Sequence, residues 1–156
     1  MVNKSKNLGT AAETRVVRYL AANGFPYAER RALAGIKDLG DITGTPDIAW
    51  EVKAGQAAWN ASDNQIDKWL VETEVERVNA KASVGILVVA RRGKNPRDWW
   101  AVMTMRNHQL LLGHALTHPS LHLYPCRTTL SRAVEMLRHG GWGDPPEDLP
   151  PEGTPA

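Results

Sequence analysis

Three ionisable residues in one short stretch, Asp41, Glu51 and Lys53, could perform chemistry together. Side chains on a strand alternate between its two faces, so a strand through Glu51 and Lys53 would hold this acid and this amine side by side. Two carboxylates suit Mg²⁺, which prefers oxygen ligands, and the amine could orient or deprotonate a water that attacks a phosphodiester. The alternative is that Glu51 and Lys53 form only a solvated ion pair on an edge strand.

The stretch from Asp41 to Lys53 has to position these groups, and its pattern predicts two short strands around a turn. Residues 43–46, Thr-Gly-Thr-Pro, have turn chemistry, and the apolar positions on either side are Ile42, Ile48, Trp50 and Val52. Because Val52 would point to the face opposite Glu51, we expect the strand to be anchored in a core beneath the site.

The pattern alone does not decide which aspartate accompanies Glu51. Asp47 shares the predicted strand with Glu51, and four residues at ~3.3 Å each separate them by ~13 Å, too far to share one ion. Asp38 and Asp41 both lie across the turn. If the turn centres on residues 44–45, simple pairing puts Asp38 opposite Glu51 and leaves Asp41 three residues out of register.

An aspartate followed after a short gap by Glu-x-Lys at a strand end resembles the PD-(D/E)XK nuclease superfamily. Gly40-Asp41-Ile42 and residues 48–53, Ile-Ala-Trp-Glu-Val-Lys, are most similar to the Holliday junction resolvases of archaea and their phage-encoded relatives. The resemblance covers roughly residues 9 to 91 and favours Asp41, with strand twist or a bulge correcting the register. It implies a restriction-endonuclease-like α/β fold, in which helices flank a mixed central sheet.

The resemblance also implies an activity in DNA recombination or repair. It implies a Mg²⁺-dependent endodeoxyribonuclease, able to use Mn²⁺, that hydrolyses phosphodiesters in branched DNA and resolves Holliday junctions as a homodimer. The residues this family would use are Asp41, Glu51 and the Val52 carbonyl for the metal, Lys53 for the attacking water, and Glu13 and Gln65 from two helices. The alternatives are a related nuclease acting on flaps, ends or specific duplex sites, and a non-catalytic DNA-binding protein of the same fold.

Glu13 also has a purely structural interpretation. Residues 9–23 predict a helix in which Thr10 caps the N-terminus and Glu13 completes a capping box. A capping glutamate could face a metal only if its side chain were shared or the cap lay elsewhere. Residues 62–80 predict a second, longer helix with Gln65 in its first turn, and the glutamates expected mostly on its exposed side are Glu72, Glu74 and Glu76.

Two pairs of arginines lie close to these acids in the sequence. Arg30 and Arg31 end a predicted first strand, and Arg91 and Arg92 open a run of four cations in seven residues. Guanidinium groups match phosphate geometry, so we expect both pairs to bind the DNA backbone. The alternative for each pair is solvated surface. The second pair follows residues 84–90, whose nearly continuous apolar sequence predicts a strand buried on both faces.

The whole chain of 156 residues predicts one domain. We expect a flexible basic segment over residues 1–8, a nuclease domain over 9–141 and a disordered, acidic, proline-rich tail over 142–156. A strand over residues 99–105 and a helix over 128–139 complete the predicted elements.

Composition bounds the partners and the compartment. The formal net charge of +2 is too small to indicate nucleic-acid binding by itself, so a DNA-binding surface requires local clustering of cations. The single cysteine, Cys126, excludes an internal disulfide and is compatible with a reducing cytoplasm. No apolar run approaches the length of a membrane span, and we expect neither a membrane partner nor an organic cofactor.

Overall fold

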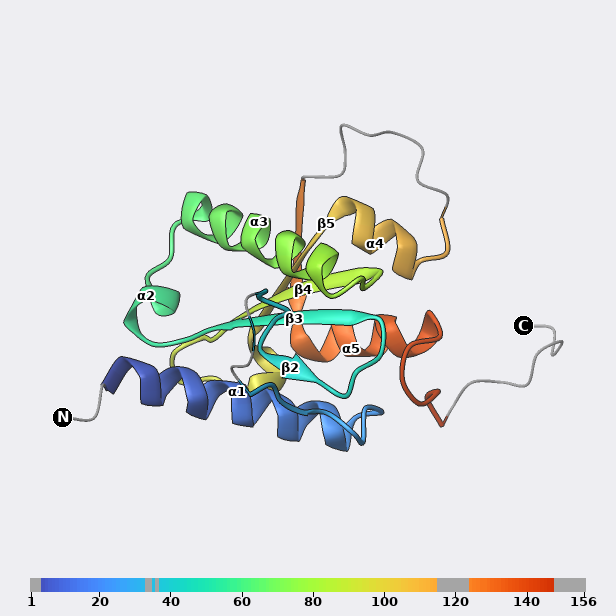
Figure 1. The fold of residues 1–156 in the computed structure, drawn as a ribbon, viewed down its shortest axis with the longest axis horizontal. Coiled ribbons are helices and arrows are strands. Elements are labelled where there is room, and N and C mark those ends of the chain that lie inside the picture. The colour runs from blue at the N-terminus through green and yellow to red at the C-terminus, as the bar shows by residue number, and fades with distance from the viewer. Residues whose placement is uncertain (1–3, 33–34, 36, 115–123, 148–156) are drawn as a thin grey trace, which may run out of the picture.

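A four-stranded mixed sheet forms the centre of this computed structural model, which describes residues 4–32, 35, 37–114 and 124–147 (Figure 1). Its strands, in spatial order, are β3 (Ile48–Lys53), β4 (Val84–Val89), β5 (Trp100–Thr104) and β6 (Pro125–Thr129). β3 and β4 are parallel, with Glu51 opposite Leu87, whereas β5 and β6 each run antiparallel to the strand before them. The predicted mixed sheet flanked by helices is confirmed.

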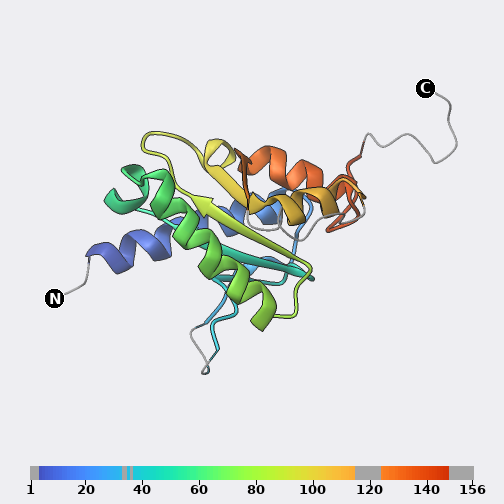
Figure 2. The same ribbon diagram turned by 90° about the horizontal axis from the view of Figure 1, so that it is seen from above.

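Helices cover both faces of the sheet, and the alternation along β3 assigns each of its side chains to one face. Ile48, Trp50 and Val52 belong to the larger core, together with residues of α1 (Lys4–Ala22) and α5 (Leu130–His139). Glu51 and Lys53 therefore point to the other face, which α3 (Asp63–Asn79) covers. Figures 1 and 2 show α1 and α3 on opposite sides of β3 and β4.

The segment before β3 does not form the predicted hairpin with it. Instead, β2 (Ile42–Thr43) pairs antiparallel with β1 (Glu29–Arg30) in a separate two-stranded sheet. Asp41, just before β2, is the residue of this segment that contacts the edge of β3. Its N–H donates to the Trp50 carbonyl at 2.7 Å, and its Oδ2 accepts from the Val52 N–H at 2.7 Å. A carboxylate therefore occupies the edge of β3 where a hairpin would place a backbone carbonyl.

Gly40 allows the backbone before Asp41 to approach β3 so closely. Its φ is +89°, and a Cβ at this position would lie 2.7 Å from the Trp50 carbonyl oxygen. Glycine alone adopts this left-handed conformation without penalty and leaves the space free. The glycine of the Gly-Asp-Ile pattern is thus required by backbone geometry.

The helices begin where local hydrogen bonding allows. α1 starts at Lys4, so Thr10 lies inside the helix and the predicted capping box at Thr10 is wrong. Residues Lys4–Leu8, which were predicted to be flexible, are helical. Residues 1–3 lie outside the described residues. α3 starts as predicted, with Ser62 Oγ accepting from the Gln65 N–H at 3.2 Å. The elements that the sequence did not predict are α2 (Gln56–Trp59), the 3₁₀ helix Pro96–Asp98, α4 (Met105–Leu111) and β6.

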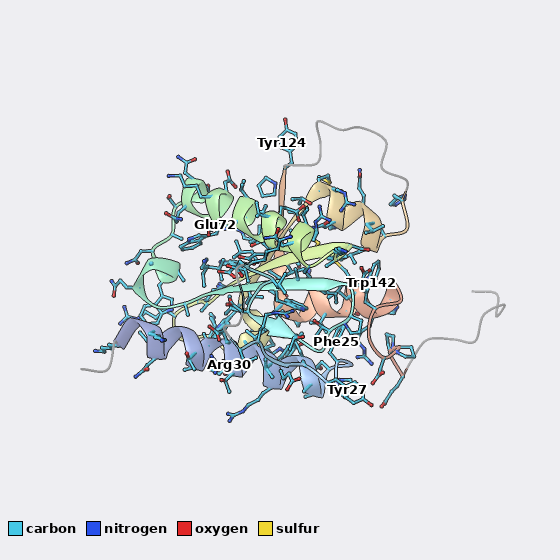
Figure 3. All side chains as sticks on the ribbon, viewed as in Figure 1. Phe25, Tyr27, Arg30, Glu72, Tyr124 and Trp142 are labelled. Carbon is cyan, nitrogen blue, oxygen red and sulfur yellow. The ribbon has the colours of Figure 1, made fainter. Side chains whose placement is uncertain are left out.

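The chain after α5 packs back onto the domain. Trp142 Nε1 donates to Asp47 Oδ2 at 3.0 Å, and the Asp144 N–H donates to the Gly24 carbonyl at 2.7 Å. Trp142 and Phe25 line the same hollow, at the end of the molecule where Figure 3 labels them. The start of the predicted tail therefore belongs to the domain, while residues 148–156 lie outside the described part. Within the described residues, no helix has the length and apolarity needed to cross a membrane.

We expect Gly40→Ala to destabilise the fold more than Gly93→Ala. Both residues have positive φ, at +89° and +71°, but a Cβ at Gly93 would meet nothing within 4 Å. The control substitution should cost about 1–2 kcal/mol from backbone strain alone. The clash with Trp50 should add about 1–3 kcal/mol at Gly40. Urea unfolding of both variants measures the difference, and equal costs would mean that the close approach at Gly40 is wrong.

Candidate functional site

Asp41 lies beside Glu51 because it bonds to the backbone on both sides of that residue. The Trp50 carbonyl and the Val52 N–H face the outer edge of β3, and Asp41 forms a hydrogen bond of 2.7 Å with each of them. Glu51 points toward α3 and is only 8% exposed. Two carboxylates are thus held next to each other by one strand edge.

The other two aspartates near the turn have different places. Asp38 is exposed, and its Oδ1 accepts from the Gly40 N–H at 3.1 Å. Asp47 precedes β3 at the opposite end from Lys53, with φ at +69°, and its Oδ1 accepts from the Ser83 N–H at 2.8 Å. The register that favoured Asp38 does not occur, because β2 is not part of the β3 ladder.

The protonation of Asp41 reflects this crowding of acids. Burial, with the Glu51 and Glu13 carboxylates acting in the same direction, raises the pKa of Asp41 to about 7, although the hydrogen bond from Val52 opposes the rise. At neutral pH the Asp41–Glu51 pair therefore holds a proton for part of the time. A cation bound between like charges would relieve this repulsion.

A fourth acid, Glu76 of α3, was missed by sequence reasoning. It is 4% exposed, although the helix pattern predicted an outward position, and its Oε2 has no hydrogen-bond partner among the described residues. Burial raises the pKa of Glu76 to about 9, with the charges of Glu51 and Asp38 and a hydrogen bond to Glu51 acting in the same direction. Glu76 is therefore protonated at neutral pH and lies against Glu51.

Glu76 lies at the edge of the buried stripe of α3, near a contact with a segment distant in sequence. Ile66, Leu70 and Thr73 form the buried stripe of α3, and helical geometry continues this stripe between positions 76 and 77. The Asn79 side chain donates to the Asp38 carbonyl at 3.0 Å, which brings the segment before β2 against this end of α3. The position of Glu76 at the edge of this stripe was the only feature of the sequence that could have indicated its burial.

Lys53 extends the site toward α3. Its Nζ lies 2.5 Å from Glu51 Oε1 and 3.6 Å from Glu72 Oε2, and 5.9 Å from the centre of the Trp69 ring. Burial lowers the pKa of Lys53, but the hydrogen bond and charge of Glu51, with Glu72 and Asp41, outweigh it and raise the pKa above its ordinary value. Lys53 is therefore an ammonium group, which donates hydrogen bonds and supplies positive charge.

Glu13 reaches the site from α1 and is paired with Arg30. Arg30 Nε lies 2.8 Å from Glu13 Oε2, and Arg30 Nη2 donates to Thr10 Oγ1 at 3.4 Å. Since Glu13 is inside the helix and does not cap it, its carboxylate is available to the site. Figure 3 labels Arg30 near α1 and Glu72 on α3, the two helices on either side of the acids.

Arg31 and Gln65 do not bond the acids directly. Arg31 Nε donates to the Gly40 carbonyl at 3.1 Å, and its N–H donates to the Asp41 carbonyl at 2.8 Å, so Arg31 positions the residue that carries the carboxylate. Gln65 lies two helical turns before Glu72, about 10 Å along the axis. Its backbone N–H donates to Ser62 Oγ at the helix cap, and its side chain forms no hydrogen bond among the described residues.

The second pair of predicted DNA ligands lies beyond the end of β4. Arg91 Nη1 donates to the Asp98 carbonyl at 2.9 Å, and its guanidinium lies 3.9 Å from the centre of the Trp100 ring. Arg92 is exposed, 5.7 Å from the centre of the Trp59 ring. These arginines contact aromatic rings and form no ion pair with the acids around Glu51.

Glu51 interacts with both Asp41 and Glu76, while Glu13 acts on Asp41. In the described part of the chain, no three side chains of histidine, cysteine, aspartate or glutamate are arranged as a group that could hold a metal ion. Comparison of the chain with protein-family models, with curated proteins and with solved structures finds no match.

Without divalent metal, the stability of the protein should fall as the pH rises from about 5 to about 9. The folded pKa of Glu76, about 9, exceeds its ordinary value of 4.5, so over this range the folded state holds a proton that the unfolded state has lost. The stabilisation is complete below the unfolded pKa and is lost as the pH passes through the folded one. Asp41 contributes in the same direction up to its pKa of about 7.

Glu76→Gln should flatten this dependence and raise the melting temperature at pH 9 relative to wild type. One kcal/mol corresponds to roughly 2–4 °C for a domain of this size. Glu135→Gln, which removes an exposed carboxylate on α5, is the matched control and should leave the slope unchanged. Thermal unfolding in EDTA between pH 5 and pH 9 makes the measurement, and a wild-type slope in Glu76→Gln would contradict the raised pKa.

Proposed function

We propose that the protein is a Mg²⁺-dependent endodeoxyribonuclease with a restriction-endonuclease-like fold, and that it cuts branched DNA such as a Holliday junction. The observation that carries the proposal is the placement of Asp41 against Glu51, with the Lys53 ammonium 2.5 Å from the Glu51 carboxylate. Two acids and a charged amine on one strand edge are the groups required for hydrolysis of a phosphodiester.

The oxygen donors of this site fit a hard divalent cation. Asp41 and Glu51 supply carboxylate oxygens, and one or two carboxylates with waters suffice for Mg²⁺. The N–H and C=O of one strand residue face the same edge, so the Val52 carbonyl faces the edge at which Asp41 accepts from the Val52 N–H. Burial and the neighbouring Glu51 charge raise the pKa of Asp41 to about 7, and a bound cation would favour its ionised form. Mn²⁺ has similar ligand preferences and would substitute.

The chain's own residues would then divide the work. Bound Mg²⁺ would polarise a phosphoryl oxygen and offset developing charge. Lys53 keeps its proton in the folded protein, so it would orient the attacking water and stabilise the phosphoryl oxygens instead of removing a proton. Glu13 lies close enough to Asp41 to raise its pKa and would hold a water at the edge of the site.

Glu76 has a positioning role in this proposal. It is protonated at neutral pH and shares a hydrogen bond with Glu51, so it would fix the orientation of that carboxylate from the side of α3. A neutral acid can do this without adding charge to the site. Glu51 is thereby oriented by Lys53 and Glu76 together.

Resolution of a four-way junction requires two cuts, and each domain offers one such site. The proposal therefore includes a homodimer that presents two sites to one junction. A cleavage panel of junction, flap, nicked and linear DNA distinguishes a junction resolvase from a nuclease of the same superfamily with another substrate. Binding of DNA without cleavage of any member of the panel would favour the non-catalytic alternative.

Asp41→Asn and Glu51→Gln should each lower Mg²⁺-dependent cleavage of a synthetic junction by at least about a hundredfold, because a neutral amide is a poor ligand for a hard cation. Binding of the junction in EDTA should be retained or strengthened in both variants, since each removes a negative charge that repels phosphate.

Asp47→Asn is the matched control and should cleave at nearly the wild-type rate. Asparagine tolerates positive φ, and its carbonyl oxygen can still accept from the Ser83 N–H. Asp38→Asn should be mild or intermediate, through loop order. Cleavage at the wild-type rate by Glu51→Gln, or loss of cleavage in Asp38→Asn with full activity in Asp41→Asn, would disprove the assigned site.

A further inference from the structure

Two hollows meet at the exposed ring of Trp59, just beyond Lys53. Their volumes are about 350 Å³ and 240 Å³, and both are lined by Trp59, Ala90, Arg91, Arg92 and Lys94. Trp59 is the last residue of α2, and it is 40% exposed although the fold does not require an exposed tryptophan there. Figures 1 and 2 both show α2 beside the first turns of α1, at the end of the molecule opposite α5.

The charge of these hollows is the reverse of that of the acidic site. Their cationic lining residues are Arg15, Arg91, Arg92, Lys94 and Arg127, and among the described residues no aspartate or glutamate lines either hollow. The net charge of the chain is only +2, so this concentration of cations is local. Such a surface binds anions, and a polyanion that spans both hollows would be bound most strongly.

Three of these cations lie over aromatic rings, within cation–π distance. Arg92 lies 5.7 Å from the centre of the Trp59 ring, while Arg91 and Arg127 lie 3.9 Å and 4.8 Å from that of Trp100. A guanidinium that stacks with its flat face keeps its N–H groups free for phosphate. Arginine and tryptophan in this arrangement can bind the backbone and the bases of a nucleic acid at the same time.

The loop that carries these cations is ordered before any ligand binds. Trp99 Nε1 donates to the Lys94 carbonyl at 3.0 Å, Arg91 Nη1 donates to the Asp98 carbonyl at 2.9 Å, and the Lys94 N–H donates to the Arg91 carbonyl at 3.2 Å. Ordering in advance lowers the entropic cost of binding. The cations of this loop are therefore held in place by hydrogen bonds within the loop.

We infer that this surface, the Trp59 groove, binds a single-stranded segment of DNA next to the cleavage site, with an unpaired base stacked on Trp59. The inference rests on the proposed nuclease function and narrows its branched substrates to those with an unpaired segment, such as a flap, in place of a fully paired four-way junction. Bases inside a duplex are already stacked on each other, so only an unpaired base can use the ring of Trp59. Hollows of this size also suit single nucleotides better than a double helix.

The groove is continuous with the acidic site along the chain. Lys53 is followed by Ala54 and Gly55, which line the larger hollow, and the Ala90 N–H donates to the Lys53 carbonyl at 2.9 Å. A strand held on Trp59 would therefore lie next to the end of β3 that carries Lys53. The groove would place the junction between unpaired and paired DNA at the acids.

Fluorescence anisotropy in EDTA tests the inference with the full chain, a labelled twelve-nucleotide oligo-dT and a duplex of the same length. Trp59→Ala should weaken binding of the single strand roughly tenfold, because one base–aromatic stack contributes about 1–3 kcal/mol. Trp59→Phe should remain within about threefold of wild type, and duplex binding should be unchanged in both variants. Tyr27→Ala, which removes an 82% exposed aromatic ring elsewhere, is the matched control.

Arg92→Ala provides a second variant that does not depend on packing, since Arg92 is exposed. It should lower the salt dependence of single-strand binding by about 0.7 units of slope for one lost phosphate contact. Arg132→Ala on α5 is its control, also an exposed arginine, but outside the groove. Unchanged single-strand affinity in Trp59→Ala, an equal loss for duplex, or tighter binding of RNA of matching length would overturn the inference.

Cleavage assays with Mg²⁺ separate this inference from the proposed activity. Cleavage of branched DNA by the wild type, together with single-strand binding that does not depend on Trp59, would disprove the role of the groove and support the nuclease activity. Binding that depends on Trp59 without any Mg²⁺-dependent cleavage would disprove the nuclease activity, and with it the role of the groove in substrate choice. Both results in the expected direction support the two proposals together.

Discussion

The hydrogen bond from the Val52 N–H to the Asp41 carboxylate, with its companion from the Asp41 N–H to Trp50, organises the molecule around β3. It closes the outer edge of the strand, joins the small β1–β2 sheet to the large one, and holds two acids side by side. Gly40 and Arg31 serve this contact, one by leaving room for the backbone and the other by bonding it. Loss of this contact would no longer hold Asp41 beside Glu51, and the site would lose its pair of acids.

The electrostatics of the protein are divided between two neighbouring regions. Around Glu51 the carboxylates outnumber the cations, and the pKa values of Asp41 and Glu76 rise to about 7 and about 9 because burial and like charges oppose ionisation. Beyond Lys53 the arrangement reverses, and arginines line hollows without acids among the described residues. An anionic polymer would be attracted by the second region, and a cation would let it approach the first.

Sequence pattern was sufficient for those features that depend on local periodicity. The alternation over Ile48–Lys53 predicted that Glu51 and Lys53 share a face, and Ser62 predicted the start of α3. It failed where a contact joins distant segments through a side chain. No turn rule encodes a carboxylate that replaces a strand partner, so the hairpin was wrong. Glu76 lies at the edge of the buried stripe of α3, where helical periodicity alone did not decide whether its side chain faces the core or solvent.

The two borders of the four-stranded sheet are both closed to further strands, by different means. Asp41 occupies the free edge of β3, while β6, the opposite border, begins with Pro125, which has no N–H to donate, and carries the exposed Arg127. Open sheet borders invite pairing between copies and aggregation. Extension of the sheet by a second copy of this chain is therefore disfavoured at both borders, which favours helices or loops for a symmetric assembly.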